Sequence, residues 1–166
     1  KGERVPTLQD VLETVPPGSR LFIEIKAGIE IVPHVVAMLE QWRHTPKRAV
    51  VIAFSFDVAT AMKKSMPGIP VYWLVSFEQS RQDGSWKPNV DSVVSRTKQA
   101  GLDGINTNYT PLLTRELVAR VHAEGLGYYV WTVNDPGDAR ILRQIGIDGI
   151  TTDRPAWLRQ QMRDDG

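Results

Sequence analysis

The sequence predicts an α/β fold of the (βα)8 TIM-barrel type, with this chain supplying about six βα units of the barrel. Six short apolar stretches begin near residues 20, 49, 71, 104, 127 and 149. A segment with helical periodicity follows each stretch, which favours parallel strands joined by crossover helices. The strands start about 22 to 33 residues apart, and a barrel of eight units averages ~31 residues per unit. We therefore expect residues 1–166 to form the C-terminal part of a single barrel domain.

The first helix is predicted from its capping signals. Thr7 can cap a helix with Asp10 three residues later, which is the spacing of a capping box. The segment Pro16-Pro17-Gly18 ends this helix, and a strand is expected over residues 21–26. The apolar stripe of the helix is formed by Leu8, Val11, Leu12 and Val15.

Two more βα units follow. Apolar residues at helical spacing between residues 31 and 42 precede a nearly continuous β-branched and aliphatic strand over residues 49–55. Asp57 is the expected cap of the next helix, and residues 71–75 form another short strand. Residues 76–88 are polar and rich in turn formers, so we expect a loop there.

The last three units end on turn signals. Helices are predicted to stop at Gly101, Gly125 and Gly146, and Asp135-Pro136 is expected to open one of them. The segments 101–108 and 146–153 repeat a glycine stop, a tight turn and a strand start, which supports repeated units. The predicted strands cover 104–108, 128–133 and 150–152, and the predicted helices cover 90–101, 114–124 and 156–163.

An open six-stranded parallel sheet is the alternative architecture. No Gly-x-Gly-x-x-Gly follows the first strand, and no Gly-x-x-x-x-Gly-Lys-Ser/Thr occurs, so nucleotide binding is not supported. We favour a barrel whose first units are absent from this chain.

Composition narrows the classes of protein. Lys and Arg total 20 and Asp and Glu 19, and this balance gives no footprint for nucleic acid. The chain has no cysteine, which excludes disulfides, zinc thiolates and a cysteine nucleophile. No apolar run approaches the ~20 residues of a membrane helix. We expect a soluble protein that does not span a membrane, with a cytoplasmic location favoured over a periplasmic or secreted one.

The first candidates for chemistry are Glu24 and Lys26. Side chains alternate along a strand, so both lie on one face of the strand over 21–26, with Ile23 and Ile25 on the other. Burying two ionisable groups is costly unless they pair, bind a metal or face a solvated site. A buried ion pair and a functional site are both open readings.

Five segments in order then resemble the glycerophosphodiester phosphodiesterase family. They span residues 5 to 155 and correspond to the C-terminal two-thirds of that family. The segments are Val5-Pro-Thr-Leu-Gln-Asp-Val-Leu12, Phe22-Ile-Glu-Ile-Lys26, Ala53-Phe-Ser-Phe56, Val130-Trp-Thr-Val-Asn-Asp135 and Gly146-Ile-Asp-Gly-Ile-Thr-Thr-Asp-Arg-Pro155.

The resemblance implies hydrolysis of glycerophosphodiesters to an alcohol and glycerol 3-phosphate. It also implies a divalent metal, Mg or Ca, held by three carboxylates, and two histidines that act as acid and base. Only one of these carboxylates has a counterpart here, Glu24, and the early histidine motifs have none. Lys26 is implied as a charge facing a phosphate oxygen, which makes it the catalytic candidate.

Three further residues are candidates for substrate binding. Phe56 and Trp131 at strand ends would wall the glycerol or the leaving alcohol, although both also suit an ordinary core. Asn134 would hydrogen-bond substrate or simply shape the turn before Asp135. For Asp153 a structural cap or salt bridge is favoured over a metal role. The histidines are not expected to be catalytic, because none lies at a strand end: His34, His44 and His122.

The leading hypothesis is thus a metal-dependent phosphodiesterase acting on a small-molecule glycerophosphodiester. The 166 residues alone are expected to be inactive, with a missing N-terminal segment or a second chain completing the barrel. One alternative is a catalytically inactive partial barrel that acts as an interaction or assembly module through its open strand edges. Another is a barrel enzyme of small phosphorylated metabolites, which the lack of a glycine-rich phosphate loop disfavours.

Overall fold

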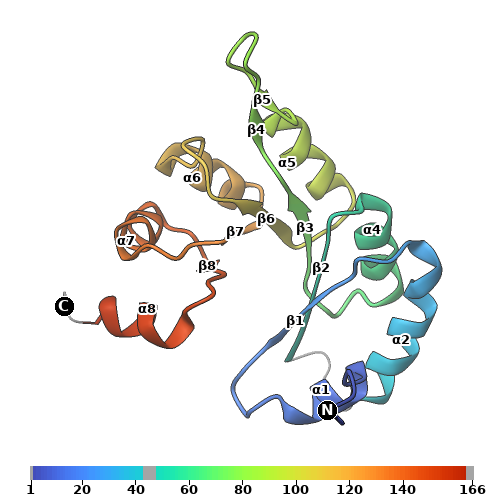
Figure 1. Ribbon diagram of the computed structural model, residues 1–166. Helices are drawn as coiled ribbons and strands as arrows, with labels where there is room; N and C mark the ends of the chain where they lie inside the picture. Colours follow the sequence, from blue (N-terminus) through green and yellow to red (C-terminus); the bar gives the residue numbers. More distant parts are fainter. Residues whose placement is uncertain (1, 43–47, 164–166) are drawn as a thin grey trace. The chain divides into compact units, whose positions relative to one another are not determined.

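In the described part of the chain, the six strands of one sheet alternate with helices, and two more strands pair separately (Figure 1). The structure, a computed structural model, describes residues 2–42 and 48–163. The chain divides into two compact units, Lys1–Tyr72 and Trp73–Gly166, which are described separately. The strand order is β1-β2-β3 and then β3-β6-β7-β8, and β3 (Val71–Val75) crosses the boundary between the units.

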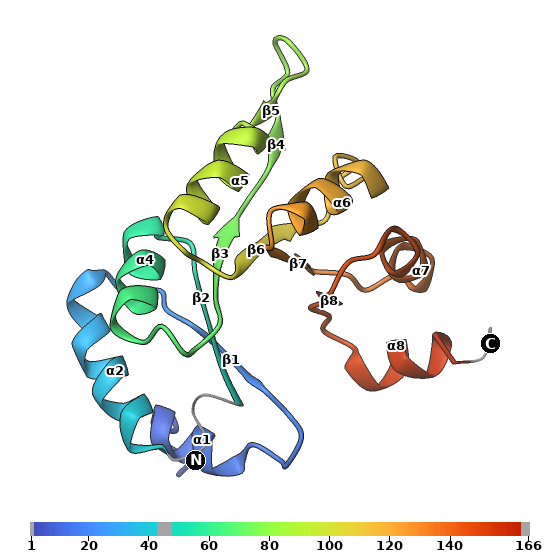
Figure 2. The ribbon, with the colours of Figure 1, turned by 180° about the vertical axis from the view of Figure 1, so that it is seen from behind.

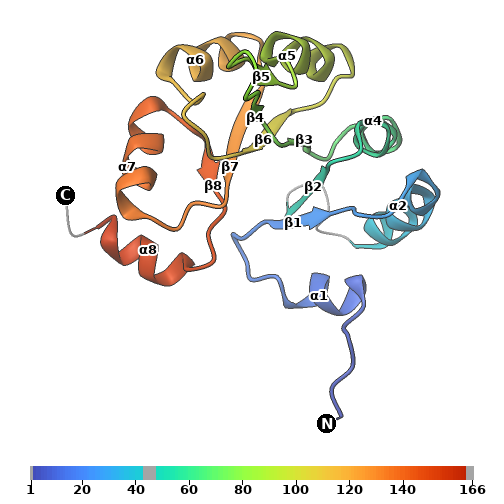
Figure 3. The same cartoon turned by 45° about the horizontal axis from the view of Figure 1, so that its top comes forward.

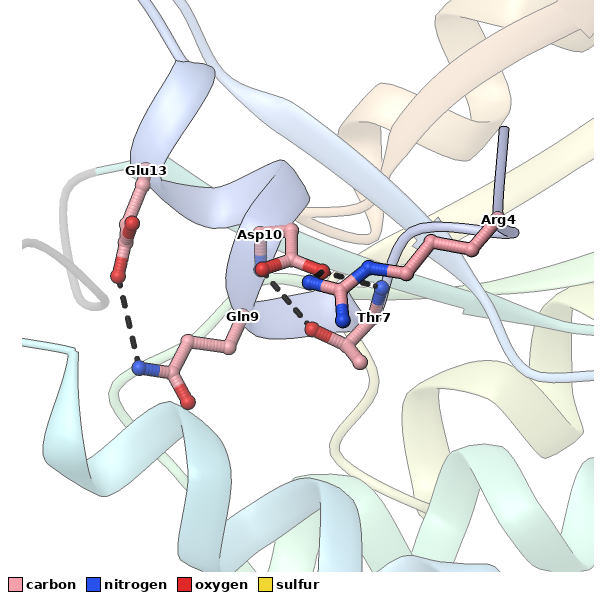
Figure 4. Close-up of polar contacts among 5 residues, drawn as sticks. All are labelled: Arg4, Thr7, Gln9, Asp10 and Glu13. Atoms are coloured by element: carbon pink, nitrogen blue, oxygen red, sulfur yellow. Dashed lines mark hydrogen bonds and ion pairs between the residues drawn. The ribbon is translucent and has the colours of Figure 1, made fainter. Parts of the chain in front are cut away.

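The first unit begins with the predicted capped helix. Thr7 Oγ1 accepts a hydrogen bond from the Asp10 amide at 3.2 Å, and the Thr7 amide donates to Asp10 Oδ2 at 2.8 Å (Figure 4). Arg4 lies 3.8 Å from the same carboxylate. The hydrogen bond from the Thr7 amide is the main cause that lowers the pKa of Asp10. The capping box predicted from sequence is confirmed, and it opens α1 (Leu8–Thr14).

Strand β1 (Leu21–Glu24) pairs in parallel with β2 (Ala49–Ala53), with Leu21 opposite Ala49 and Glu24 opposite Ile52. The predicted strand over 21–26 is therefore shorter by two residues. A short 3-10 helix, η1 (Ile29–Ile31), leads into α2 (Val32–Gln41), which confirms the helical periodicity there.

Helix α4 (Phe56–Ser65) packs against β2. Val51 and Ala53 of the strand are fully buried, and so are the helix residues Val58, Ala59 and Met62. The expected cap, Asp57, is wrong: Ser55 caps this helix, because its hydroxyl accepts from the Val58 amide at 3.3 Å. Asp57 lies in the first turn, where its negative charge suits the helix dipole.

The second unit carries β6 (Gly104–Asn108), β7 (Gly127–Trp131) and β8 (Gly149–Ile150), paired in parallel. Figure 3 shows its helices ranged along one side of these strands. Strands β7 and β8 each start one residue before the predicted strands over 128–133 and 150–152, and each ends two residues sooner. The helices are α5 (Val90–Gln99), α6 (Arg115–Ala123), α7 (Pro136–Ile145) and α8 (Pro155–Gln161).

The region expected to be a loop, residues 76–88, contains a β-hairpin. Strands β4 (Glu78–Gln79) and β5 (Trp86–Lys87) pair antiparallel, and Figure 2 shows the hairpin rising beside α5. The loop prediction was wrong because a strand of two residues is too short to show period-two alternation.

The two repeated turn segments have the same hydrogen-bond geometry. Gly101 and Gly146 both have positive φ, 68° and 96°, after a helix end. In each case the amide of the next residue bonds the carbonyl five residues earlier, Leu102 to Thr97 and Ile147 to Leu142, both at 3.1 Å. This is the Schellman arrangement, which ends a helix by satisfying its last carbonyls.

Across residues 2–42 and 48–163, none of the helices has both the length and the apolar character that crossing a membrane would require.

Candidate functional site

Glu24 is the last residue of β1, at the carboxyl end of the strand. Alternation places it with Phe22 on the face opposite Ile23 and Ile25. On that face Phe22 is 39% exposed. Ile52 of β2 lies opposite Glu24, and Phe54, two residues further along the chain, is 51% exposed. The other face of β2 is the one that α4 covers. Glu24 therefore does not lie on the helix-packed side of the strand.

Lys26 is the partner of Glu24, with Nζ 3.7 Å from Oε2. The Glu24 side chain is 31% exposed and that of Lys26 80% exposed, so the pair is not the buried ion pair that the sequence left open. Strand β1 ends at Glu24, so Lys26 lies beyond the strand and reaches water. One hydrogen bond of the sheet continues past the strand end, from the Ile25 amide to the Ile52 carbonyl at 2.9 Å. A solvated pair of this kind contributes little to stability, which leaves both groups available to a ligand.

The fit of this region to a divalent metal is incomplete. The Glu24 carboxylate supplies the oxygen chemistry that Mg or Ca prefers. Among the described residues, however, no group of three or more His, Cys, Asp or Glu side chains is arranged to hold a metal ion. These residues alone do not form a metal centre.

Phe56 does not sit at a strand end as expected. Strand β2 ends at Ala53, and Phe56 is the first residue of α4, directly after its cap Ser55. The aliphatic run over 49–55 continued the strand pattern past the point where the Ser55 cap turns the chain into the helix. Phe56 still lies at the carboxyl end of β2, in the first unit with Glu24 and Lys26.

Trp131 is the last residue of β7 in the second unit, opposite Asn108 of β6. Its indole Nε1 donates to the Asn106 carbonyl at 3.3 Å, and its own carbonyl accepts from the Tyr109 amide at 2.8 Å. Alternation places Trp131 on the same face as Tyr129, which is half-buried, whereas Tyr128 and Val130 on the other face are fully buried. The indole is thus fixed at a strand end, on the less buried face.

Asn134 forms a polar cluster with the residues after β8. Its Oδ1 accepts from the Thr152 hydroxyl and the Asp153 amide, both at 2.9 Å, and its Nδ2 donates to Asp153 Oδ2 at 2.8 Å. This geometry favours the turn-shaping role for Asn134, with one amide N–H left over for a substrate. It also agrees with a structural role for Asp153.

Two asparagines and a tyrosine near Trp131 were missed by the sequence reasoning. Asn106 is 1% exposed and its Oδ1 has no partner among the described residues, while Asn108 holds the backbone of Phe77. Tyr109 donates to Asp138 at 2.9 Å, and burial followed by that hydrogen bond raises its pKa. Period-two alternation puts Asn106 and Asn108 on one face of the predicted 104–108 strand. Pairing of this strand with the one that ends at Trp131 puts the indole on the same face, and this pattern could have identified both asparagines.

The histidines lie away from strand ends where they are described. His34 is in α2 and His122 is in α6, where Nε2 lies 3.0 Å from Asp148 Oδ2. Asp148 also accepts from the Tyr128 amide at 2.6 Å, so this contact ties α6 to the turn before β8. His44 falls outside the described residues.

Comparison with known proteins decides the family. The model of the glycerophosphoryl diester phosphodiesterase family matches residues 1–157. The chain belongs to this family. A glycerophosphodiester phosphodiesterase of Caldanaerobacter subterraneus is 28% identical over 170 residues, which cover 99% of this chain and 65% of the relative.

Solved structures of this family share the fold. A glycerophosphodiester phosphodiesterase from Parabacteroides distasonis superposes with a TM-score of 0.77 at 23% identity, over 99% of this chain and 66% of the other. A phosphodiesterase from Oleispira antarctica, solved with the product sn-glycerol-3-phosphate, gives 0.76 at 20% identity, over 95% and 61%. The fold is α/β of the (βα)8 barrel type, and the six strands of this chain are part of such a barrel.

The chain spans about three fifths of the length of the curated relatives that it matches, with 62%, 60% and 65% of three of them covered.

Proposed function

We propose that the protein to which this chain belongs hydrolyses glycerophosphodiesters to an alcohol and glycerol 3-phosphate. The observation that carries the proposal is the position of Glu24 at the carboxyl end of β1, with Lys26 beside it and off the helix-packed face. In (βα)8 barrels the carboxyl ends of the strands form the active-site face. Membership of the family supports the reaction class.

The proposed roles follow from the chemistry of each side chain. Glu24 is a ligand of the divalent metal, which when bound acts as a Lewis acid on phosphoryl oxygens. Lys26 presents a mobile ammonium to a phosphate oxygen. Phe56 and Trp131 offer flat apolar surface to the glycerol or the leaving alcohol. Asn134 holds the turn over 152–154 and offers its remaining N–H to the substrate.

The remaining ligands of the metal are proposed to come from residues outside these 166. This is supported by the lack of a three-ligand group among the described side chains and by the partial coverage of the relatives. Such residues would belong either to a preceding segment of the same polypeptide or to a second chain. Residues 1–166 are then the C-terminal part of one barrel domain.

The test measures release of glycerol 3-phosphate by the intact protein from a glycerophosphodiester, with Mg²⁺ or Ca²⁺ and with a chelator. Glu24→Gln keeps the shape of the side chain and removes its charge. We expect it to weaken metal affinity and lower kcat together, each by at least about tenfold, since even changes beside a metal ligand cost that much.

Glu40→Gln is the matched control, because it makes the same chemical change at an exposed position of α2. It should leave both values unchanged. Unchanged metal affinity and rate in Glu24→Gln would remove Glu24 from the site. Absence of metal-dependent turnover by the intact protein would overturn the proposed reaction and favour the interaction module.

A further inference from the structure

We propose that Asp83, in the turn of the β4–β5 hairpin, is a site of spontaneous isomerisation to isoaspartate, and that the folded turn slows this reaction. The inference is independent of the proposed function, because it concerns covalent chemistry within the chain itself. It is carried by the pairing of Asp83 with Gly84, by the exposure of both residues and by the hydrogen bonds that they make in the turn.

An aspartate that precedes a glycine is open to attack by the main chain, because glycine has no Cβ to hinder the approach. The Gly84 amide nitrogen attacks Cγ of the protonated Asp83 carboxyl group, and the new N–C bond closes a succinimide ring. The carboxyl hydroxyl leaves with the amide proton as water. Another water molecule then opens the ring. Cleavage of the bond between this nitrogen and the Asp83 main-chain carbonyl carbon leaves the chain running through Cγ, which is isoaspartate, whereas cleavage at Cγ restores aspartate.

The turn leaves both reacting residues in contact with water. Asp83 and Gly84 are exposed, and they lie at the end of the hairpin that is remote from β3 (Figure 1). Beyond the chain neighbours of Gly84, a Cβ added to it would meet a single atom within 4 Å, Nε2 of Gln79 at 3.8 Å. The water that opens the succinimide therefore has access, and packing does not protect this pair.

Hydrogen bonds hold the attacking nitrogen in place. The Gly84 amide donates to the Ser80 carbonyl at 2.9 Å, and the Gly84 carbonyl accepts from the Gln79 side chain at 2.9 Å. Gly84 also has a φ of +69°, which residues with a side chain rarely adopt. Attack on Asp83 requires the nitrogen to give up its hydrogen bond and to turn towards Cγ, so the folded turn adds to the barrier.

Hydrogen bonds also hold the carboxyl group that would be attacked. Asp83 Oδ1 accepts from the Ser85 hydroxyl at 2.7 Å and from the Ser85 amide at 3.1 Å. Hydrogen bonds from the Ser80 side chain and then from Ser85 lower the pKa of Asp83, since they favour the charged form. The carboxylate is a poor electrophile, because the leaving group must be a hydroxyl and not an oxide. Both reacting groups are thus kept in their less reactive states.

Isomerisation would change the shape of the hairpin. The turn is closed by the bond from the Ser80 amide to the Ser85 carbonyl at 2.8 Å, together with the bond from the Gly84 amide to the Ser80 carbonyl. Isoaspartate adds a methylene group to the main chain between these residues and moves the carboxyl group onto Cα. A longer chain does not fit a turn closed by these bonds, so we expect the hairpin to open there.

The experiment incubates the intact protein at neutral pH and follows the fraction of isoaspartate in the proteolytic peptide that contains Asp83, by liquid chromatography and mass spectrometry. The same protein unfolded in guanidinium chloride is the reference. We expect isomerisation in the folded protein to be slower by about fivefold or more, the factor to which one hydrogen bond of ordinary strength corresponds.

Ser85→Ala removes the hydroxyl that donates to Asp83. It should raise the rate in the folded protein by about two- to fivefold, for the same reason, and leave the rate in the unfolded protein unchanged. Ser76→Ala is the matched control, because it makes the same chemical change at an exposed position of the same connection, before β4, and should alter neither rate. Hydrogen exchange of the Gly84 amide shows whether the turn of each variant stays closed.

Each outcome decides one part of the inference. Absence of isoaspartate in the unfolded protein would show that Asp83 is not a site of isomerisation. Equal rates in the folded and unfolded protein would overturn the protection by the turn. A rate in Ser85→Ala equal to that of the parent, with the Gly84 amide still protected from exchange, would remove the hydrogen bond of Ser85 from the explanation. None of these readouts requires turnover of a substrate, so they leave the proposed function untouched.

Discussion

Ionisable side chains on the strands of this protein differ in how far water reaches them. Glu24 remains about a third exposed and keeps its partner Lys26 at 3.7 Å. Tyr128 is fully buried, and its hydroxyl accepts a hydrogen bond from Thr107 at 3.3 Å. Burial raises the pKa of Tyr128 to about 12, because the phenolate would lose its hydration. Exposure to water thus distinguishes Glu24, which a ligand can reach, from Tyr128, whose role is structural.

The buried Tyr128 predicts a loss of stability at high pH. Its pKa is higher in the folded protein than the ordinary value of 10.0, so the unfolded chain releases the proton first. The stabilisation is complete below pH 10 and is lost as the pH rises towards 12, by roughly 2–3 kcal/mol. Denaturant unfolding at several pH values between 9 and 12 measures this loss.

Tyr128→Phe should flatten that dependence while costing about 1 kcal/mol at neutral pH, since it removes one hydrogen bond. Tyr129→Phe is the comparison, because Tyr129 lies in the same strand and is only half-buried. If the free energy of unfolding depended on pH equally in the parent and in Tyr128→Phe, Tyr128 would ionise alike in the folded and the unfolded protein.

At the scale of the element, most boundaries are set by short hydrogen-bonded motifs. The capping box of α1, the Ser55 cap of α4 and the glycine turns after α5 and α7 each satisfy backbone groups that a helix end leaves free. Such motifs involve residues within a few positions of one another. Their energies are testable one at a time.

Thr7→Ala removes the acceptor for the Asp10 amide at the start of α1. We expect the free energy of unfolding to fall by about 1 kcal/mol, the usual value of a threonine cap. Gln9→Ala is the control, because Gln9 is exposed and its side chain donates to Glu13 at 3.4 Å without taking part in the cap (Figure 4). Equal effects of the two substitutions would show that the capping box adds no stability.

Gly146→Ala places a side chain where φ is 96°. The expected cost is about 1–2 kcal/mol, since the left-handed region is unfavourable for residues with a Cβ. Gly68→Ala serves as the control, because its added Cβ meets no atom within 4 Å and its φ is not positive. Thermal unfolding should therefore separate the two variants, and a Gly146→Ala protein as stable as the parent would contradict the turn assignment.

For the whole molecule, the decisive property is that the described residues hold no complete set of ligands for the proposed metal. Glu24 is one carboxylate, and the described residues contain no three-ligand group around it or elsewhere. A single carboxylate is a weak site for a divalent cation, which prefers six or more oxygen ligands.

We accordingly expect the purified 166 residues to release no glycerol 3-phosphate from a glycerophosphodiester, with or without Mg²⁺ or Ca²⁺. The intact protein, assayed in parallel at the same molar concentration, is the positive control. Turnover by the isolated 166 residues that Glu24→Gln abolishes would contradict this expectation, because the chain would then hold a complete site.

The family and the order of strands and helices were predictable from the sequence, whereas the role of Glu24 stays a prediction. The strand that carries Glu24, the cap at Thr7 and the glycine stops at Gly101 and Gly146 depend on neighbours along the chain, and these local signals were confirmed, although the strand ends at Glu24 and not at Lys26. The hairpin in residues 76–88 was not predicted, since its pairing joins strands of two residues whose pattern is too short to detect.

The sequence by itself determined which residues alternate, where helices stop and which family the motifs resemble, because these are properties of short segments. Only the tertiary structure decided that Glu24 and Lys26 are solvated and that Asn134 is held by Thr152 and Asp153. These outcomes depend on water access and on contacts between residues far apart in the chain, such as Asn108 with Phe77. No periodicity or local propensity encodes such contacts.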